Sequence, residues 1–431
     1  MKLKLLPVAL FAITSFAFAQ QKPLWNVSTK SDIVKLDSKM QVPTNHLLDL
    51  DVASLKTSIQ NAPERFSDAK TNNTIISLPN ESGQMEKFRV YENSNMDPEL
   101  AAKYPEIKSY IGIGIDNPTS TGYFSVSPLG FKGMILSADK SAVFIEPYSK
   151  DLKTYSVYRK SDKTQSLDKF DCKVISDAND IISGDLQARP NADDATLRTF
   201  RLAMSVTGEY TAYFGGTKAL ALAAINASMT RVNGVFEKDF AVRMVLIANT
   251  DLVIYTAASS DPYSAATAGS GGAWNAELQN TLTSVIGEAN YDVGHLFGAS
   301  GGGGNAGCIG CVCVNGQKGS GFTSPNDGIP SGDNFDIDYV AHELGHQFGA
   351  NHTFTTGNEG TGVHMEPGSG STIMGYAGIT TLDVQPHSDA YFHAISIQQV
   401  TNNVKTKTCQ TNTATGNSVP TANAGLDFTI P

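Results

Sequence analysis

The sequence predicts an α/β fold for its second half, a largely parallel twisted sheet backed by helices, preceded by a separate mixed α+β module. Three observations support this. After about residue 196, segments with strand character alternate with segments of helical spacing, as in parallel sheets. Before that point, short runs alternate apolar and polar residues, which favours strands. With 431 residues the chain is too long for one hydrophobic core, so two or three folding units are expected.

The first 19 residues have the pattern of a signal peptide. A basic start, Met1 to Lys4, precedes an apolar stretch from Leu5 to Phe18, and Ala17-Phe18-Ala19 is a small-x-small cleavage site. The apolar stretch is too short to span a bilayer, and no later segment approaches the roughly 20 apolar residues that a membrane helix needs. We therefore expect cleavage after Ala19, export, and no membrane-spanning segment.

Residues 20–195 form the mixed α+β module. Tyr123 to Ser127 and Ala142 to Glu146 alternate as strands do. The polar stretch from Asp185 to Asp194 is a linker, and exposed segments of this kind are where proteolytic nicking concentrates. This position favours a removable propeptide, and a permanent accessory domain is the alternative.

The second unit, residues 196–410, contains the strand and helix alternation. We expect strands at Thr199–Val206 and Ala241–Ala248, and helices at Lys218–Phe236, Trp274–Gly287 and Asp338–Gly349. The Lys218 helix has amphipathic spacing.

Local signals complete this picture of the second unit. Asp336 or Asp338 can cap the first amides of the last helix. The glycine runs at 269–272 and 301–304 are expected to be loops, since neither has the Lys-Ser/Thr or the strand and helix setting of a phosphate cradle.

The run from His342 to His352 has the spacing of a zinc site. Residues four apart share a helix face, so His342 and His346 can present two imidazoles to one metal while Glu343 points at bound solvent. Gly349 can end the helix in the left-handed conformation, and the chain can then return His352 as a third ligand. Three protein ligands leave one position open, which is typical of catalytic zinc.

This run, followed by Met374-Gly375-Tyr376, resembles the extended metzincin signature, and the closest likeness is to the reprolysin-like (adamalysin) branch found in secreted bacterial enzymes. Similar segments are Arg201–Tyr210, Asn233–Glu237 and Tyr291–His295. Typical adamalysins have Asp directly after the third histidine. This chain has Thr353 there, and in this it resembles the pappalysin-like enzymes.

The resemblance implies one catalytic Zn2+ and hydrolysis of peptide bonds in proteins or peptides. Glu343 would act as general base, and Met374 would pack beneath the histidines as a hydrophobic floor. Tyr376 stands where astacin-like and serralysin-like enzymes carry a tyrosine that touches zinc or the oxyanion, and its alternative role is packing in the turn. Residues between Gly375 and Tyr391 would line the primed-side pocket.

Five cysteines are an odd number for an exported protein. Four lie in the second unit and can make two disulfides, with a second metal site as the weaker alternative: Cys308, Cys311, Cys313 and Cys409. The fifth, Cys172, precedes the first catalytic strand by about 25 residues. Its thiolate can occupy the fourth zinc position and silence a zymogen. A free buried thiol with steric inhibition is the alternative.

Composition excludes other classes. A net charge of -10 and a pI near 5.3, without a basic cluster, argue against a nucleic-acid partner. Asp333, Asp336 and Asp338 are oxygen donors that suit Ca2+, and capping or loop exposure is the alternative, so calcium stays open. The remaining histidines lack ligand spacing and are expected to be ordinary core or surface residues: His295, His364, His387 and His393.

Residues 411–431 resemble a linker and the first strand of a truncated β-sandwich-like module, which leaves cell-surface attachment open. The sequence as a whole predicts a secreted zinc endopeptidase made as a zymogen, with its own propeptide as partner. The alternative is an inert zinc-containing binding or adhesion module.

Overall fold

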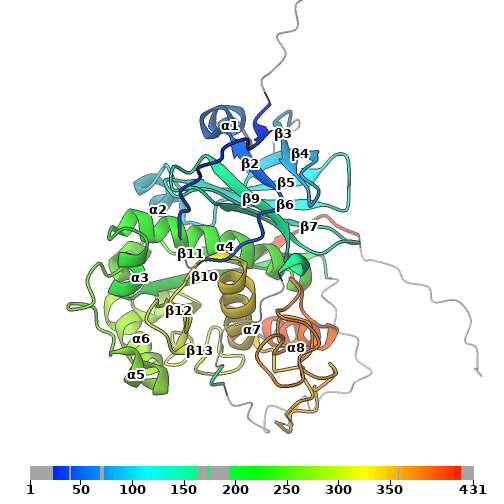
Figure 1. Ribbon diagram of the computed structural model, residues 1–431. Helices are drawn as coiled ribbons and strands as arrows, with labels where there is room; N and C mark the ends of the chain where they lie inside the picture. The colour runs from blue at the N-terminus through cyan, green and yellow to red at the C-terminus, as the bar shows by residue number, and fades with distance from the viewer. Residues whose placement is uncertain are drawn as a thin grey trace, which may run out of the picture.

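The computed structural model describes residues 23–37, 40–67, 72–163, 172–174, 194–357 and 359–418, arranged around two β-sheets (Figure 1). The expected signal peptide, nearly all of the expected linker and residues 419–431 lie outside these ranges. The mixed α/β character predicted from the sequence is confirmed, because both sheets are packed with helices.

The N-terminal module is built on a nine-stranded sheet of order β1-β2-β9-β8-β7-β6-β5-β4-β3, in which every neighbouring pair is antiparallel. The two expected strands are present as β6 and β8. The strands are β1 (Trp25–Val27), β2 (Leu47–Leu50), β3 (Ile75–Pro79), β4 (Met85–Glu92), β5 (Lys108–Gly114), β6 (Thr121–Ser127), β7 (Gly130–Leu136), β8 (Val143–Pro147) and β9 (Thr154–Arg159). The helices α1 (Val52–Ile59) and α2 (Pro98–Lys103) complete the module.

The second sheet has the order β11-β10-β12-β14-β13. Strand β12 pairs with the C-terminal half of β10, and β15 pairs with its N-terminal end. The β10 pairs with β11 and β12 are parallel, as is the β12 pair with β14, whereas β13 and β15 pair antiparallel. The strands are β10 (Thr196–Val206), β11 (Val242–Leu246), β12 (Val293–Phe297), β13 (Gly303–Asn305), β14 (Gly321–Ser324) and β15 (Thr411–Ala414). Residues 411–414, which the sequence assigned to a linker, therefore extend this sheet.

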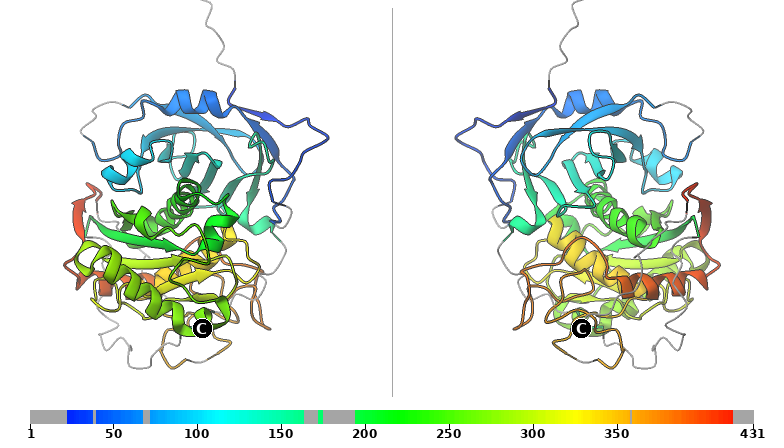
Figure 2. Two further views of the ribbon diagram at one scale, coloured as in Figure 1. Left: turned by 90° about the vertical axis from the view of Figure 1, so that its left-hand side faces the viewer. Right: turned by 90° about the vertical axis from the view of Figure 1, so that its right-hand side faces the viewer.

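Helix α4 (Lys218–Phe240) lies between the two sheets (Figure 1, Figure 2). The expected amphipathic helix is instead buried on nearly all sides, because the N-terminal sheet covers the face that would otherwise meet solvent. One hydrophobic core runs through both units, joining Tyr123 and Met134 of the module to Leu202 and Phe236.

The helix that carries the zinc motif begins as a π-helical segment, η7 (Asn334–Val340), and continues as α7 (Ala341–Phe348). The predicted cap is wrong: neither Asp336 nor Asp338 caps this helix, because their carboxylates bind Arg231 and Lys160. The other helices of this unit are α3 (Gly208–Tyr213), α5 (Ala266–Ala268), α6 (Trp274–Thr281) and α8 (Ala394–Lys405), and α6 runs on into the π-helical turn η5 (Leu282–Ile286).

Both glycine runs have more structure than the expected loops. Gly269 to Gly271 lie in a helical turn that is kinked at Gly272, where φ is 112°, within η4 (Gly269–Ala273), and Gly303 and Gly304 start the edge strand β13. Among the described residues, no helix has the length and apolar character to cross a membrane.

Candidate metal centre

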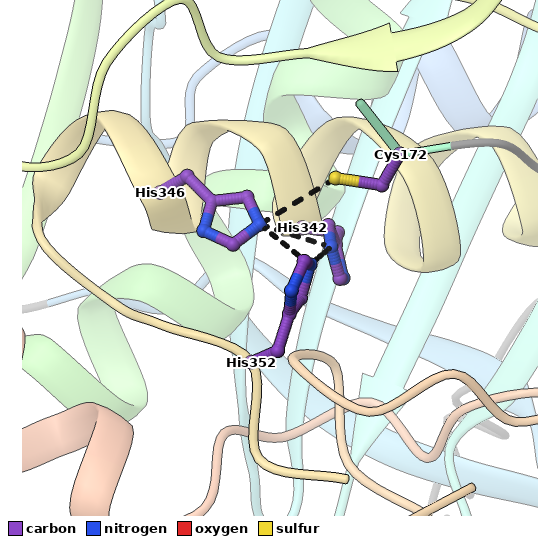
Figure 3. Close-up of side chains that lie close together, drawn as sticks. All are labelled: Cys172, His342, His346 and His352. Atoms are coloured by element: carbon purple, nitrogen blue, oxygen red, sulfur yellow. Dashed lines mark hydrogen bonds between the residues drawn. The ribbon is translucent and has the colours of Figure 1, made fainter. Parts of the chain in front are cut away.

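Three histidines converge at the end of α7 (Figure 3). His342 and His346 stand one turn apart on the helix, and Gly349 ends it with a φ of 119° that strongly favours glycine. The chain then turns back and brings in His352. The Nε2 atom of His342 lies 3.2 Å from those of His346 and His352, and the other two Nε2 atoms are 3.0 Å apart.

Each ring is oriented by the hydrogen bond of its other nitrogen. Nδ1 of His342 donates to the carbonyl of Ile373 and Nδ1 of His346 donates to that of Ala350, both at 2.7 Å. A carbonyl can only accept, so both Nδ1 atoms carry the proton and both Nε2 lone pairs face the shared centre. These Nδ1 contacts thereby orient two of the three nitrogens that meet at the centre.

The triangle of nitrogens fits tetrahedral zinc. With Zn–N bonds of about 2.05 Å, the nitrogens of a tetrahedral site lie about 3.3 Å apart, close to the separations seen here. Burial lowers the pKa of His342 to about 4 and holds the pKa values of His346 and His352 well below the usual range. The imidazoles are therefore neutral at physiological pH, as metal ligands must be.

Cys172 supplies a fourth donor at this centre. Its Sγ lies 3.6 Å from Nε2 of His346, and the four donor atoms all lie within 4.8 Å of one another (Figure 3). For Zn–S of about 2.3 Å and Zn–N of about 2.05 Å, tetrahedral geometry places sulfur and nitrogen about 3.6 Å apart. Burial, together with the nearby carboxylate of Glu343, raises the pKa of the Cys172 thiol well above its usual value. A bound cation would act in the opposite sense and favour the thiolate.

The segment around Cys172 is held by the edge of the second sheet. Cys172 forms a parallel bridge with Gly304 of β13, and the amide of Lys173 donates to the Gly304 carbonyl at 3.0 Å. The ammonium of Lys173 donates to the carbonyl of Ser270 at 2.8 Å. Residues 172–174 therefore lie along the edge strand β13, beside the histidines.

Glu343 faces the same centre as a buried carboxylate. Its side chain is fully buried, and neither carboxylate oxygen has a hydrogen-bond partner among the described residues. It rests against β13, where a Cβ added to Gly304 would lie 2.2 Å from Oε1 of Glu343. Burial raises the pKa of Glu343 to about 8. An unpartnered buried carboxylate of this kind is poised to exchange a proton with a bound molecule.

Met374 and Tyr376 lie on the loop beyond the third histidine. Met374 is fully buried under α7, and a Cβ added to Gly345 would meet its sulfur at 2.7 Å. The Tyr376 ring centroid lies 4.6 Å from that of His352, and its hydroxyl donates to the backbone carbonyl of Cys172 at 3.4 Å. The structure thus brings both residues to the metal centre.

Two glutamates near the centre escaped the sequence analysis. Both carboxylate oxygens of Glu359 lie 3.0 Å from Nδ1 of His352. Glu366 accepts from the hydroxyls of Thr353 and Thr372, so it ties the segment after the third histidine to the methionine loop. Thr353 stands where a typical adamalysin has aspartate, and this departure was the one signal pointing to a substitute carboxylate nearby.

The cysteines of the second unit form two disulfides, as predicted; the pairing, which the sequence left open, is Cys308–Cys311 and Cys313–Cys409, and Cys172 is free. The segment between Cys308 and Cys311 contacts the end of α7, where the amide of Gly310 donates to the carbonyl of His346. This pairing leaves no thiolate in that cluster for the alternative second metal site.

The other histidines have ordinary partners. His295 is buried and bonds through its two ring nitrogens to Gln347 and Thr323. His364 donates to a backbone carbonyl, His387 bonds the carbonyl of Lys163, and His393 caps α8.

The acidic residues before α7 form ion pairs. Asp338 and Asp333 bind the buried ammonium of Lys160 at 2.5 and 3.4 Å, and Asp336 binds Arg231 at 2.9 Å. Binding of calcium by these carboxylates, which the sequence left undecided, stays open.

A comparison with protein families finds a match in the second unit. A family model described as Metallo-peptidase family M12B Reprolysin-like matches residues 196–407, about half of the chain. The matched segment begins with β10 and includes the whole metal centre apart from Cys172. No curated protein sequence matches the chain.

Proposed function

Because residues 196–407 belong to the reprolysin-like metallopeptidases of family M12B, we propose that the chain is a secreted zinc-dependent endopeptidase made as a zymogen. The observation that carries the proposal is the triangle of three Nε2 atoms, 3.0 to 3.2 Å on a side, beside the unpartnered carboxylate of Glu343. Peptidases of this family act on proteins or peptides, so these are the expected substrates.

His342, His346 and His352 would hold the ion. Zinc, when bound, supplies a Lewis acid and lowers the pKa of water to about 7. Glu343 takes the proton of the attacking water and passes it to the departing amine. Burial raises the pKa of Glu343, which strengthens its hold on the proton before the proton passes to the amine. The Tyr376 hydroxyl donates to the oxygen that becomes negative during attack.

An extended substrate fits the edge strand β13. Its backbone groups can pair with an added strand, which is the usual way that a sheet edge binds an extended peptide. Cys172 and Lys173 use the same edge, so the segment and a substrate compete for one place. This competition favours inhibition of the uncut chain both by the Cys172 sulfur and by steric exclusion.

The face of α4 that the N-terminal module covers is suited to exposure. The amide of Asn95 donates to the hydroxyl of Thr230 and the hydroxyl of Ser109 donates to Asn226, both at 2.9 Å, while Asn233 donates to Asn95 at 3.1 Å. These three α4 side chains can bond water after the module leaves, so exposing them leaves none of the three without a hydrogen-bond partner. This supports a removable propeptide over a permanent domain.

The pattern of residues 1–19 supports export, and the two disulfides are compatible with an extracellular location. The alternative function, an inert zinc-containing binding or adhesion module, would not require a glutamate beside the first ligand. The presence of Glu343 favours the enzyme.

A Glu343→Ala variant tests the proposal. We expect it to keep its fold and one zinc per chain but to lose casein cleavage, whereas Glu209→Ala, at an exposed position on α3, should cleave casein like the parent protein. Unchanged casein cleavage by folded, zinc-loaded Glu343→Ala would remove the assigned role.

The zymogen is tested separately with Cys172→Ala. The uncut variant should cleave casein faster than the uncut parent chain but more slowly than the processed enzyme, and a chelator should abolish that activity. A silent but zinc-loaded Cys172→Ala chain would favour steric exclusion as the means of inhibition.

A further inference from the structure

The third histidine of the metal centre is held differently from the other two. His342 and His346 stand on α7 and donate to neutral backbone carbonyls. His352 lies beyond the end of the helix, and its Nδ1 contacts both carboxylate oxygens of Glu359 at 3.0 Å. One ligand out of three therefore depends on a carboxylate side chain for its orientation.

The contact between Glu359 and His352 is a charge-assisted hydrogen bond. Both oxygens of an ionised carboxylate can only accept, so at 3.0 Å from them the Nδ1 atom of His352 carries the proton. Proton placement at Nδ1 leaves the Nε2 lone pair directed at His342 and His346. A carboxylate behind a metal-bound imidazole also makes that imidazole a stronger donor.

The position of Glu359 is itself fixed by neighbouring contacts. Its backbone amide donates to Nε2 of His364 at 3.0 Å, and Nδ1 of His364 donates to the carbonyl of Phe354 at 2.6 Å. The Phe354 ring packs against His352, with centroids 5.2 Å apart. The loop that follows His352 thus contacts this ligand through the Phe354 ring and the Glu359 carboxylate. His364 links the backbone of Phe354 to the backbone of Glu359.

We propose that Glu359 is a positioning residue of the metal centre: its carboxylate sets the tautomer and ring orientation of His352 and strengthens zinc binding through that ligand. This inference rests on the proposed function, because it requires zinc at the three histidines. Loss of a partner of this kind reduces metal affinity by about 10- to 100-fold.

The test measures zinc affinity of the full chain by competition with a chelator, using Zn2+ alone as the probe. Glu359→Gln removes the charge and keeps the size of the side chain. We expect a dissociation constant raised about 10- to 100-fold, while the matched variant Glu209→Gln on α3 leaves it unchanged.

A second readout separates positioning from general stability. Without zinc, Glu359→Gln should melt at the same temperature as the parent protein, and the rise in melting temperature on adding Zn2+ should be smaller in the variant. In a His352→Ala background, Glu359→Gln should have no further effect on zinc affinity. Three results would each overturn the inference. They are an unchanged zinc dissociation constant in Glu359→Gln, a melting temperature lowered as much without zinc as with it, and a loss of zinc affinity in the His352→Ala background as large as in the parent background.

The outcomes also distinguish this inference from the proposed function. If the parent protein binds zinc at one ion per chain and cleaves casein while Glu359→Gln binds zinc as tightly, only the role of Glu359 fails. If the parent protein binds no zinc, the proposed function fails first.

Discussion

A Lys160→Met substitution should loosen the N-terminal module from the second unit. The ammonium of Lys160 is fully buried, 2.5 Å from Asp338 and 3.4 Å from Asp333. Removing one partner of a buried pair costs about 3 to 5 kcal/mol, because the other charge is left uncompensated. Lys163 still binds Asp333 at 2.9 Å, so the lower value applies. About 3 kcal/mol corresponds to a dissociation constant for the two units raised about 150-fold.

The assay uses a chain cut at an engineered protease site between residues 175 and 193, with Glu343→Ala added to prevent self-cleavage. Dissociation of the N-terminal module is then followed by surface plasmon resonance. The matched control is Lys103→Met. Lys103 also contacts the second unit, but its ammonium lies 3.5 Å from Asp251 in a surface ion pair, and the lysine side chain is half exposed. Such a pair contributes about 0 to 1 kcal/mol. Equal dissociation constants for Lys160→Met and Lys103→Met would refute the reasoning.

Two further predictions concern stability. Burial lowers the pKa of His295 to about 4 from an ordinary 6.5, so the unfolded chain takes up a proton that the folded chain does not. Stability should therefore fall as the pH drops from 6.5 to 4, and His295→Gln should reduce this slope in urea unfolding by about 1.4 kcal/mol per pH unit; identical slopes would contradict the assignment. Replacing Cys313 and Cys409, 96 positions apart, by serine should cost about 4.7 kcal/mol, against about 2 kcal/mol for Cys308 and Cys311, 3 apart. Equal losses in denaturant titrations would show that loop length does not set these contributions.

The sequence could predict the ligands because helical periodicity determines their geometry. Four-residue spacing places His342 and His346 on one face, and a glycine with positive φ is the simplest way to return a third ligand. Glu359 could not be found in this way. It lies seven positions after His352 in a polar stretch, and only the closure of the loop brings the two together.

The packing between the two units could not be predicted from the sequence either. Helix α4 has amphipathic spacing, yet the N-terminal sheet covers its polar face, a contact that no local pattern encodes. Asp338 reads as a helix cap when its neighbours alone are considered, but a lysine 178 positions earlier takes its carboxylate. Gly303 and Gly304 have little strand propensity, and they form a strand because β14 offers an edge with which to pair.

Zinc K-edge X-ray absorption of the uncut full-length protein tests the central claim most directly. We predict one zinc per chain, with three nitrogen ligands at Zn–N distances of about 2.0 Å and one sulfur ligand at a Zn–S distance of about 2.3 Å. In Cys172→Ala the sulfur should be replaced by oxygen while the three nitrogens remain. A chain without zinc, or a spectrum that lacks the three nitrogens, would contradict the account.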